Sequence, residues 1–202
     1  MKNIGFTFDS ACVAQMCKGT WYHLHQIGKI KSFLTGDQLR TVVHAYVISR
    51  LDLYNSLLLG LPKYVTQKLQ LVQNAAALMI LGGSRRDHVT PLLIKLHWLP
   101  VEKRILFKVL LIFFKCKIGE APLYLQELLD PYCPQSRLRS STKDLYNLPD
   151  DDTVHYADTK KKDFSYRAPL EWNRLPSRVK NCDTVDSFKR ELKTHLFRLA
   201  YF

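Results

Sequence analysis

The sequence lacks the cysteine pattern of a secreted, disulfide-bonded protein. Its five cysteines are scattered over 202 residues, and no two of them form a Cys-x-x-Cys pair. An odd and unpaired set argues against a disulfide framework and indicates a reducing compartment. We therefore expect an intracellular protein, nuclear or cytoplasmic. The cysteines are Cys12, Cys17, Cys116, Cys133 and Cys182.

A long hydrophobic run is also missing. The most apolar stretch, Ile105–Phe114, is interrupted by Lys108. It is much shorter than the roughly 20 residues that a bilayer-spanning helix needs. Residues 1–3 lead into an alternating pattern and not into the apolar segment of a secretory signal. We expect no membrane partner.

Motifs for metal binding and nucleophilic catalysis are absent as well. Cys12, Cys17, His23 and His25 are clustered, but on a helix the two cysteines diverge by about 140° and the two histidines by about 200°. Neither pair has the spacing of a zinc site. There is no Gly-x-Ser-x-Gly motif and no glycine-rich phosphate loop. We therefore expect no metal and no cofactor.

Acidic residues are scarce relative to basic ones. The chain has 18 Asp and Glu against 30 Lys and Arg, which gives a net charge of +12. Such an excess favours phosphate-rich partners. A basic surface without a specific ligand is the alternative, and charge alone does not distinguish nucleic acid from anionic lipid.

What is present indicates a mainly α-helical fold. Residues 4–8 alternate like a half-buried strand, but no second strand follows to pair with it, so the chain resembles a piece cut from something larger. Residues 11–33 predict a first helix, and a second begins with Asp37 as its N-cap. A third starts at Pro62 and ends at Gly82-Gly83. In the second helix the residues that repeat at helical spacing are Leu39, Val42, Val43, Tyr46, Val47 and Tyr54. The expected inward face of the third is Val65, Leu69, Val72, Ala76 and Met79.

Further helices are predicted in the C-terminal half. Thr90-Pro91 and Leu99-Pro100 are typical helix starts, and the helix after Pro100 is apolar almost all round, which indicates a central core helix. A short helix is expected over Ala121–Leu129, and a polar loop over 131–163 with a strand near 144–148. A last helix starts near Thr184. Its expected inward residues are Val185, Phe188, Leu192, Leu196 and Leu199.

Several short segments repeat the motifs of one known family. These are Ser49-Arg50-Leu51-Asp52, Leu69-Gln70-Leu71-Val72-Gln73-Asn74-Ala75-Ala76, Leu96-His97-Trp98-Leu99-Pro100-Val101, Arg104-Ile105, Ala168-Pro169, Trp172-Asn173 and Phe188-Lys189-Arg190-Glu191-Leu192. In order and over nearly the whole chain, they resemble the C-terminal third of the polymerase protein of LINE-type (non-LTR) retrotransposons, in the Jockey superfamily. The resemblance implies three regions: a strand from the polymerase palm over 1–9, a thumb-like helical bundle over 10–83, and a helical C-terminal region over 84–202.

The same resemblance places the polymerase carboxylates upstream of this sequence. In the family, an aromatic-Ala-Asp-Asp turn precedes the residue that matches Gly5 and holds the Mg²⁺ ions. Tyr156-Ala157-Asp158-Thr159 imitates it, but Thr159 replaces the second Asp, and Asp150–Asp152 lies in a polar loop. We therefore expect no enzymatic activity from this chain alone. Mg²⁺ belongs to the full-length parent, and polymerisation would need a partner chain that supplies the palm.

The resemblance and the charge together predict a grip on the RNA and DNA backbone. In the predicted helix after Pro100, Arg104, Lys108 and Lys115 fall within about 40° of one another. Lysine and arginine bind phosphates without reading bases, so binding should be sequence-tolerant. The solvated face of a helix is the alternative for each cation. The candidate nucleic-acid-binding residues are Lys18, Lys29, Lys31, Arg50, Arg85, Arg86, Arg104, Lys108 and Lys115.

Departures from the family pattern leave a second class of function open. Leu53-Tyr54 stands where the family has Tyr-Cys, and Leu78 stands where it has Arg. The loss of that cation weakens a role for the third helix in nucleic-acid contact. The chain could instead be a translated remnant without a selected activity, or a protein-interaction scaffold. For Trp98 and Trp172, whose neighbours are apolar, we expect core packing and not base stacking.

Overall fold

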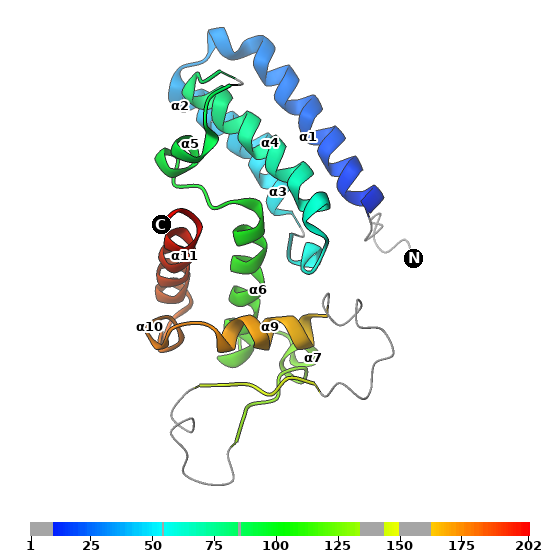
Figure 1. The fold of residues 1–202 in the computed structure, drawn as a ribbon, viewed down its shortest axis with the longest axis vertical. Helices are drawn as coiled ribbons and strands as arrows, with labels where there is room; N and C mark the ends of the chain where they lie inside the picture. The colour runs from blue at the N-terminus through cyan, green and yellow to red at the C-terminus, as the bar shows by residue number, and fades with distance from the viewer. Residues whose placement is uncertain (1–9, 54, 85, 134–143, 150–162) are drawn as a thin grey trace.

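The computed structural model describes residues 10–53, 55–84, 86–133, 144–149 and 163–202. Within them the fold is mainly helical, as predicted (Figure 1). Extended pairing among these residues is limited to one antiparallel bridge between Pro131 and Tyr146. The expected palm-derived strand over 1–9 lies outside the described residues.

The helices follow in chain order with short connections. The α-helices are α1 Ser10–Ile30, α2 Gly36–Val43, α3 Ser49–Asp52, α4 Lys63–Leu81, α5 Val89–Lys95, α6 Val101–Lys117, α7 Leu123–Gln126, α9 Phe164–Asn173, α10 Ser177–Lys180 and α11 Val185–Tyr201. Two short 3₁₀ segments, η1 Lys31–Phe33 and η3 Asn55–Leu58, and one π turn, η2 His44–Ile48, lie between them.

The start of α2 corrects one prediction. Thr35, and not Asp37, is the N-cap: its hydroxyl accepts from the Gln38 amide at 3.4 Å, and the Gln38 side chain accepts from the Thr35 amide at 2.9 Å. This reciprocal pair satisfies two free backbone donors. Asp37 lies in the first turn, where its charge still suits the helix dipole. The helix then continues through η2 into α3.

The boundaries and the inward face of α4 follow the predicted pattern closely. Val65, Leu69, Val72 and Ala76 are buried, and Met79 is partly buried against the core. The helix ends at Gly82, whose φ of 74° is the left-handed conformation that glycine adopts without strain. Gln73, on the same inward face, is also fully buried.

Helix α6 is the centre of the core, as its sequence indicates. Val109, Leu110, Phe113 and Phe114 have no exposed surface. The Phe113 ring stacks on Trp172 at a centroid distance of 4.7 Å, and Phe114 stacks on Phe188 at 4.2 Å. The predicted core positions of Trp98 and Trp172 are confirmed, since they are 9% and 0% exposed.

One predicted inward residue of α11 is not inward. Thr184 caps this helix through a reciprocal pair with Ser187, and Phe188, Leu192 and Leu196 are buried. Leu199 is 59% exposed, because the last turn of α11 borders an open groove beside α4, α5 and the start of α6.

In place of the predicted strand near 144–148, the structure has a single β-bridge, and the Asn173 side chain binds the backbone of Tyr146 on its other edge. The Tyr132 amide donates to the Leu145 carbonyl, and the Asn147 amide donates to the Asp130 carbonyl, at 3.0 and 2.8 Å. The Asn173 amide group accepts from the Tyr146 N–H at 2.9 Å and donates to its carbonyl at 2.8 Å. Helix α9, which carries Asn173, was not predicted from the sequence.

In space, α1 and α4 lie side by side, and α6 runs away from them with α11 alongside and α9 across its far end (Figure 1). The C-terminus returns to the connection between α5 and α6. One hydrophobic cluster joins buried residues from Val13 of α1 to Leu196 of α11. The core is therefore continuous across the predicted boundary at residue 83.

Two buried tyrosine hydroxyl groups should make the free energy of unfolding decrease at alkaline pH. Burial raises the pKa of both Tyr146 and Tyr201 from 10.0 to about 12. An acid whose pKa rises on folding stabilises the fold while it is protonated, so this contribution is complete below pH 10 and is lost between pH 10 and 12. We expect the free energy of urea unfolding to fall over that window, and to fall less in the Tyr146→Phe/Tyr201→Phe variant. An equally steep decline in the variant would contradict this.

Candidate nucleic-acid interface

Two of the predicted cations share a face of α1 with exposed aromatic side chains. Lys18, Trp21, Tyr22, His25 and Lys29 fall within about 100° around the helix axis, and we call them the α1 face. All five are exposed, with Trp21 at 44% and Tyr22 at 61%. Two lysines therefore flank a run of aromatic side chains along about three turns of one helix.

Arg50 and Lys31 extend this basic region. A Cβ atom added at Gly19 would lie 3.8 Å from Arg50 Nη1, so the guanidinium of α3 rests against α1 beside Lys18. Lys31 follows α1 directly in η1 and is exposed. The structure thus gathers Lys18, Lys29, Lys31 and Arg50 along a single helix.

An open groove of about 1050 Å³ runs between α1 and α4. Trp21, His25, Lys29 and Lys31 line it from the α1 side, and apolar residues of α4 line the other. Its far end is formed by the turn after α4, which also carries the exposed Arg86. Arg85 lies outside the described residues. The groove therefore combines an apolar floor with a basic border.

The predicted stripe on α6 is not uniform. The Arg104 Nη1 atom donates to both carboxylate oxygens of Asp52, at 2.7 and 2.9 Å, and its Nε atom donates to the Leu99 carbonyl at 3.0 Å. The Arg104 side chain is only 16% exposed. Lys108 is exposed and Lys115 is half-buried. The guanidinium of Arg104 is thus committed to contacts within the fold, whereas Lys108 projects from it.

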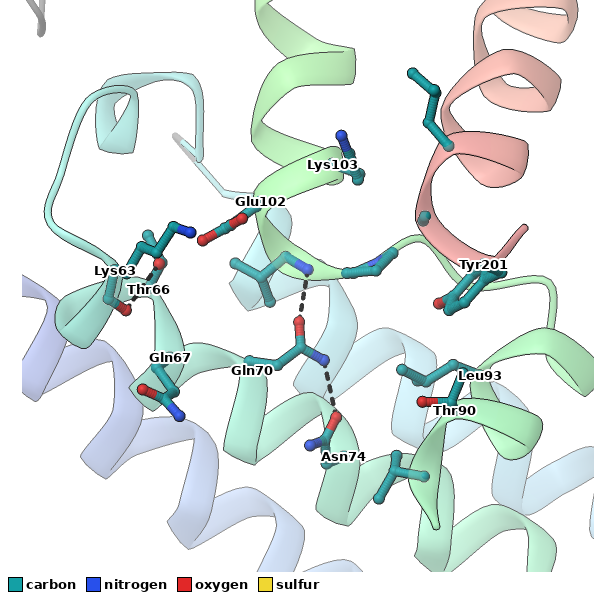
Figure 2. A pocket seen from close by; sticks show the side chains of 15 residues that line it. Lys63, Thr66, Gln67, Gln70, Asn74, Thr90, Leu93, Glu102, Lys103 and Tyr201 are labelled. Carbon is teal, nitrogen blue, oxygen red and sulfur yellow. Dashed lines mark hydrogen bonds between the residues drawn. The ribbon is translucent and has the colours of Figure 1, made fainter.

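The contact of Arg104 belongs to a larger junction at the turn between α5 and α6, residues 98–101. Gln73 Nε2 donates to the Leu99 carbonyl at 2.9 Å, and the Val101 amide donates to Gln70 Oε1 at 2.8 Å. Gln70 also donates to Asn74 Oδ1, and Figure 2 shows both of these Gln70 bonds. From the opposite side, the Tyr201 hydroxyl donates to the Trp98 carbonyl at 2.6 Å.

This junction brings together segments that are far apart in the sequence. Asp52, Gln70 and Gln73, the 98–101 turn and Arg104 meet here. All of them lie in the segments from which the resemblance to LINE polymerases was predicted. Their contacts are intramolecular, so at these positions the motif residues hold helices together. One signal in the sequence was available: Gln73 is a polar residue on the inward face of an otherwise apolar helix, and such a group needs a hydrogen-bond partner.

The sequence analysis did not identify three further residues that lie beside the predicted cations or line a cavity with them. Trp21 and Tyr22 are the exposed rings beside the basic residues, although only Trp98 and Trp172 were considered for stacking. Lys193 of α11 and Lys108 of α6 both line a second cavity. The sequence indicates only that Lys193 lies on the polar side of an amphipathic helix. It does not show that Lys108, 85 residues earlier, lines the same cavity.

Within the described residues, no group of three or more His, Cys, Asp or Glu side chains is arranged to hold a metal ion. In that same part of the chain, every helix is too short or too polar to cross a bilayer. Comparison with protein-family models, curated proteins and solved structures finds no match. The family resemblance therefore stays a prediction.

The ion pair at the junction yields a test that separates folding from binding. We expect Arg104→Gln to lower the free energy of unfolding by about 1–3 kcal/mol, because it leaves Asp52 and the Leu99 carbonyl without a charged donor. Lys108→Gln, one turn further along α6, should leave it unchanged within about 0.5 kcal/mol. Urea denaturation measures both. An Arg104 variant as stable as the Lys108 variant would refute the structural role.

Proposed function

We propose that this chain binds the backbone of RNA and DNA without sequence preference and has no catalytic activity of its own. The observation that carries the proposal is the α1 face, where the exposed rings of Trp21 and Tyr22 lie between the exposed cations Lys18 and Lys29. Arg50, Lys31 and the groove beside α4 extend it.

Each kind of side chain on this face has a distinct role in the proposed interaction. Lysine and arginine neutralise phosphates and release counterions, which makes the affinity depend on salt. Exposed aromatic rings stack on bases of any identity, with about 1–3 kcal/mol per base. Together they suit a strand with accessible bases and a regular charge. The net charge of +12 raises the local concentration of such a polyanion.

The proposal agrees with the resemblance to the thumb of LINE-type polymerases, which grips the template RNA and the primer DNA. In such an assembly the catalytic carboxylates and their Mg²⁺ ions would come from a palm-bearing partner chain. The compartment would be the nucleus or the cytoplasm. For the chain alone, primer extension with Mg²⁺ and deoxynucleotides should yield no product.

A salt series tests the electrostatic part of this proposal. We expect the affinity for a fluorescent single-stranded oligonucleotide to fall steeply as KCl rises. The Lys18→Gln/Lys29→Gln variant should reduce the slope of log K against log salt by about 1–2, because each lost phosphate contact removes up to one unit. Trp21→Ala should weaken binding by about 1–3 kcal/mol with little change in slope.

The matched control is Lys95→Gln/Lys189→Gln, which removes the same charge from an exposed position on α5 and from a half-buried one on α11, where Lys189 pairs with Asp186 at 3.0 Å. If this control changes the slope as much as the α1 variant, binding follows net charge and not the α1 face. An affinity for the oligonucleotide that does not change with KCl concentration would contradict the proposal.

A protein-interaction scaffold is the second candidate, and exposed apolar surface favours it. Phe33 is 85% exposed, and Leu71, at the α1–α4 groove, is 55% exposed. Surface of this kind often marks a protein contact. Light scattering after size exclusion discriminates between the two: a specific dimer that Leu71→Glu dissociates would favour the scaffold. A monomer that binds oligonucleotides would favour the nucleic-acid function.

A further inference from the structure

The groove between α1 and α4 is long enough to hold a short helix. On α4 its lining runs from Leu71 to Gly82, two positions that lie about 16 Å apart along the helix axis. Leu71 is 55% exposed, and Ala75, Leu78 and Met79 are half-buried. The groove, of about 1050 Å³, therefore offers apolar surface along about three turns of α4.

The border of this groove is positively charged. Lys29 and Lys31 line it from the α1 side, and its lining includes no Asp or Glu. Among the described residues, no carboxylate lies within ion-pair distance of either lysine. Asp87 lies close to the far end, at Gly83, and there its carboxylate accepts from the Ser84 amide at 2.7 Å. A molecule that fits the groove should therefore carry apolar side chains and negative charge.

A second surface of the same chain has these properties. Helix α7 and the turn after it expose Leu123, Tyr124 and Leu128, which are 68%, 66% and 45% exposed. The exposed Glu127 lies about 40° from Leu123 and about 60° from Tyr124 around the helix axis. We call these four residues the α7 face. Over residues 119–133 the sequence has three carboxylates and no lysine or arginine.

The backbone that carries the α7 face is already ordered. The Glu127 amide donates to the Leu123 carbonyl, and the Leu129 amide donates to the Gln126 carbonyl, both at 3.0 Å. Leu129 also packs against the hydrophobic core. A segment held in this way loses little conformational freedom when it binds, which favours association.

The α7 face and the groove lie at opposite ends of the molecule (Figure 1). The start of α6 is joined to α4, since the Val101 amide donates to Gln70. Helix α7 follows the other end of α6, whose 17 residues span about 25 Å. The α7 face therefore does not reach the groove of its own chain. It can meet only the groove of another copy.

We propose that the α7 face of one copy docks into the α1–α4 groove of a second copy. Its apolar side chains cover the floor of the groove, and Glu127 meets Lys29 and Lys31 at the border. Each copy offers one surface of each kind, so the contact is heterologous and builds rings or open chains. It rests on the second candidate function, the scaffold, and not on nucleic-acid binding. Because one short helix makes a small interface, we expect a dissociation constant on the order of 10 µM.

Sedimentation velocity of the full chain from about 1 to 200 µM tests this contact. The weight-average sedimentation coefficient should rise with concentration. Leu123→Ser/Tyr124→Ser removes apolar side chains from the α7 face, and Leu71→Glu places a charge on the floor of the groove. Each variant should weaken association at least about tenfold, because burial of one such side chain contributes about 1.5–3 kcal/mol.

The matched control is Leu57→Ser/Tyr64→Ser. It removes the same kinds of side chain from positions that are 52% and 63% exposed and that lie outside both surfaces. This control should associate as the wild type does. A control that dissociates as far as the α7 variant would overturn the proposal, and so would a wild type that stays monomeric over the whole range.

A mixture of the α7 variant and the groove variant tests the head-to-tail arrangement. Each keeps the surface that the other has lost, so the mixture should form a 1:1 complex that does not grow further. A mixture that stays monomeric while the wild type associates would show a symmetric contact instead and would overturn the proposal.

Glu127→Lys tests the match of charge. It changes only an exposed side chain, so circular dichroism should show an unaltered helix content. Repulsion by the lysines of the border should weaken association at least about tenfold, and an unchanged association would contradict the proposed docking. The α7 variant separates this contact from the proposed function, because it leaves the α1 face intact. It should lose self-association and still bind the oligonucleotide as the wild type does.

Discussion

The fold depends on how the turn at residues 98–101 satisfies its backbone groups. Pro100 has no N–H, and α6 begins directly after it without a side-chain cap of its own. The carbonyls of Trp98 and Leu99 and the amide of Val101 would otherwise be left without protein partners in a largely buried turn, where an unmade hydrogen bond is costly. Gln70 and Gln73 of α4, Arg104 of α6 and Tyr201 of α11 supply the partners. Three helices are therefore joined through one turn.

This arrangement changes how the motif residues are interpreted. Arg104 and Lys108 lie one turn apart on α6 and look equivalent as a basic stripe, yet Asp52 holds the first and solvent surrounds the second. A guanidinium that is hydrogen-bonded on two sides contributes to stability, and a free ammonium contributes to the electrostatic potential. Asp52, Gln70, Gln73 and Arg104 all make contacts of the first kind, within the fold.

The sequence predicted the parts of the structure that periodic burial determines. The inward face of α4, the central position of α6 and the left-handed end at Gly82 follow from local patterns. Helix α9 was missed because it is short and contains Pro169, a residue that usually interrupts a helix. Leu199 was misplaced because helical periodicity does not show where the packing against neighbouring helices stops. The basic residues were identifiable by type. Their grouping was not, since Arg50 approaches α1, and Lys193 and Lys108 line one cavity, only through tertiary packing.

The single turn of α3 links the α1 face to the second cavity. Arg50 rests against α1 at Gly19, while Asp52, two residues later, holds Arg104 at the wall of the second cavity. Successive helical positions point in different directions, so one turn serves both sides of the bundle. Because Leu51 between them is buried, α3 has little freedom to move on one side without moving on the other. Changes at Asp52 would then disturb both surfaces through the backbone, whereas changes at the exposed ends of Lys18, Lys29, Lys108 and Lys193 alter one surface at a time.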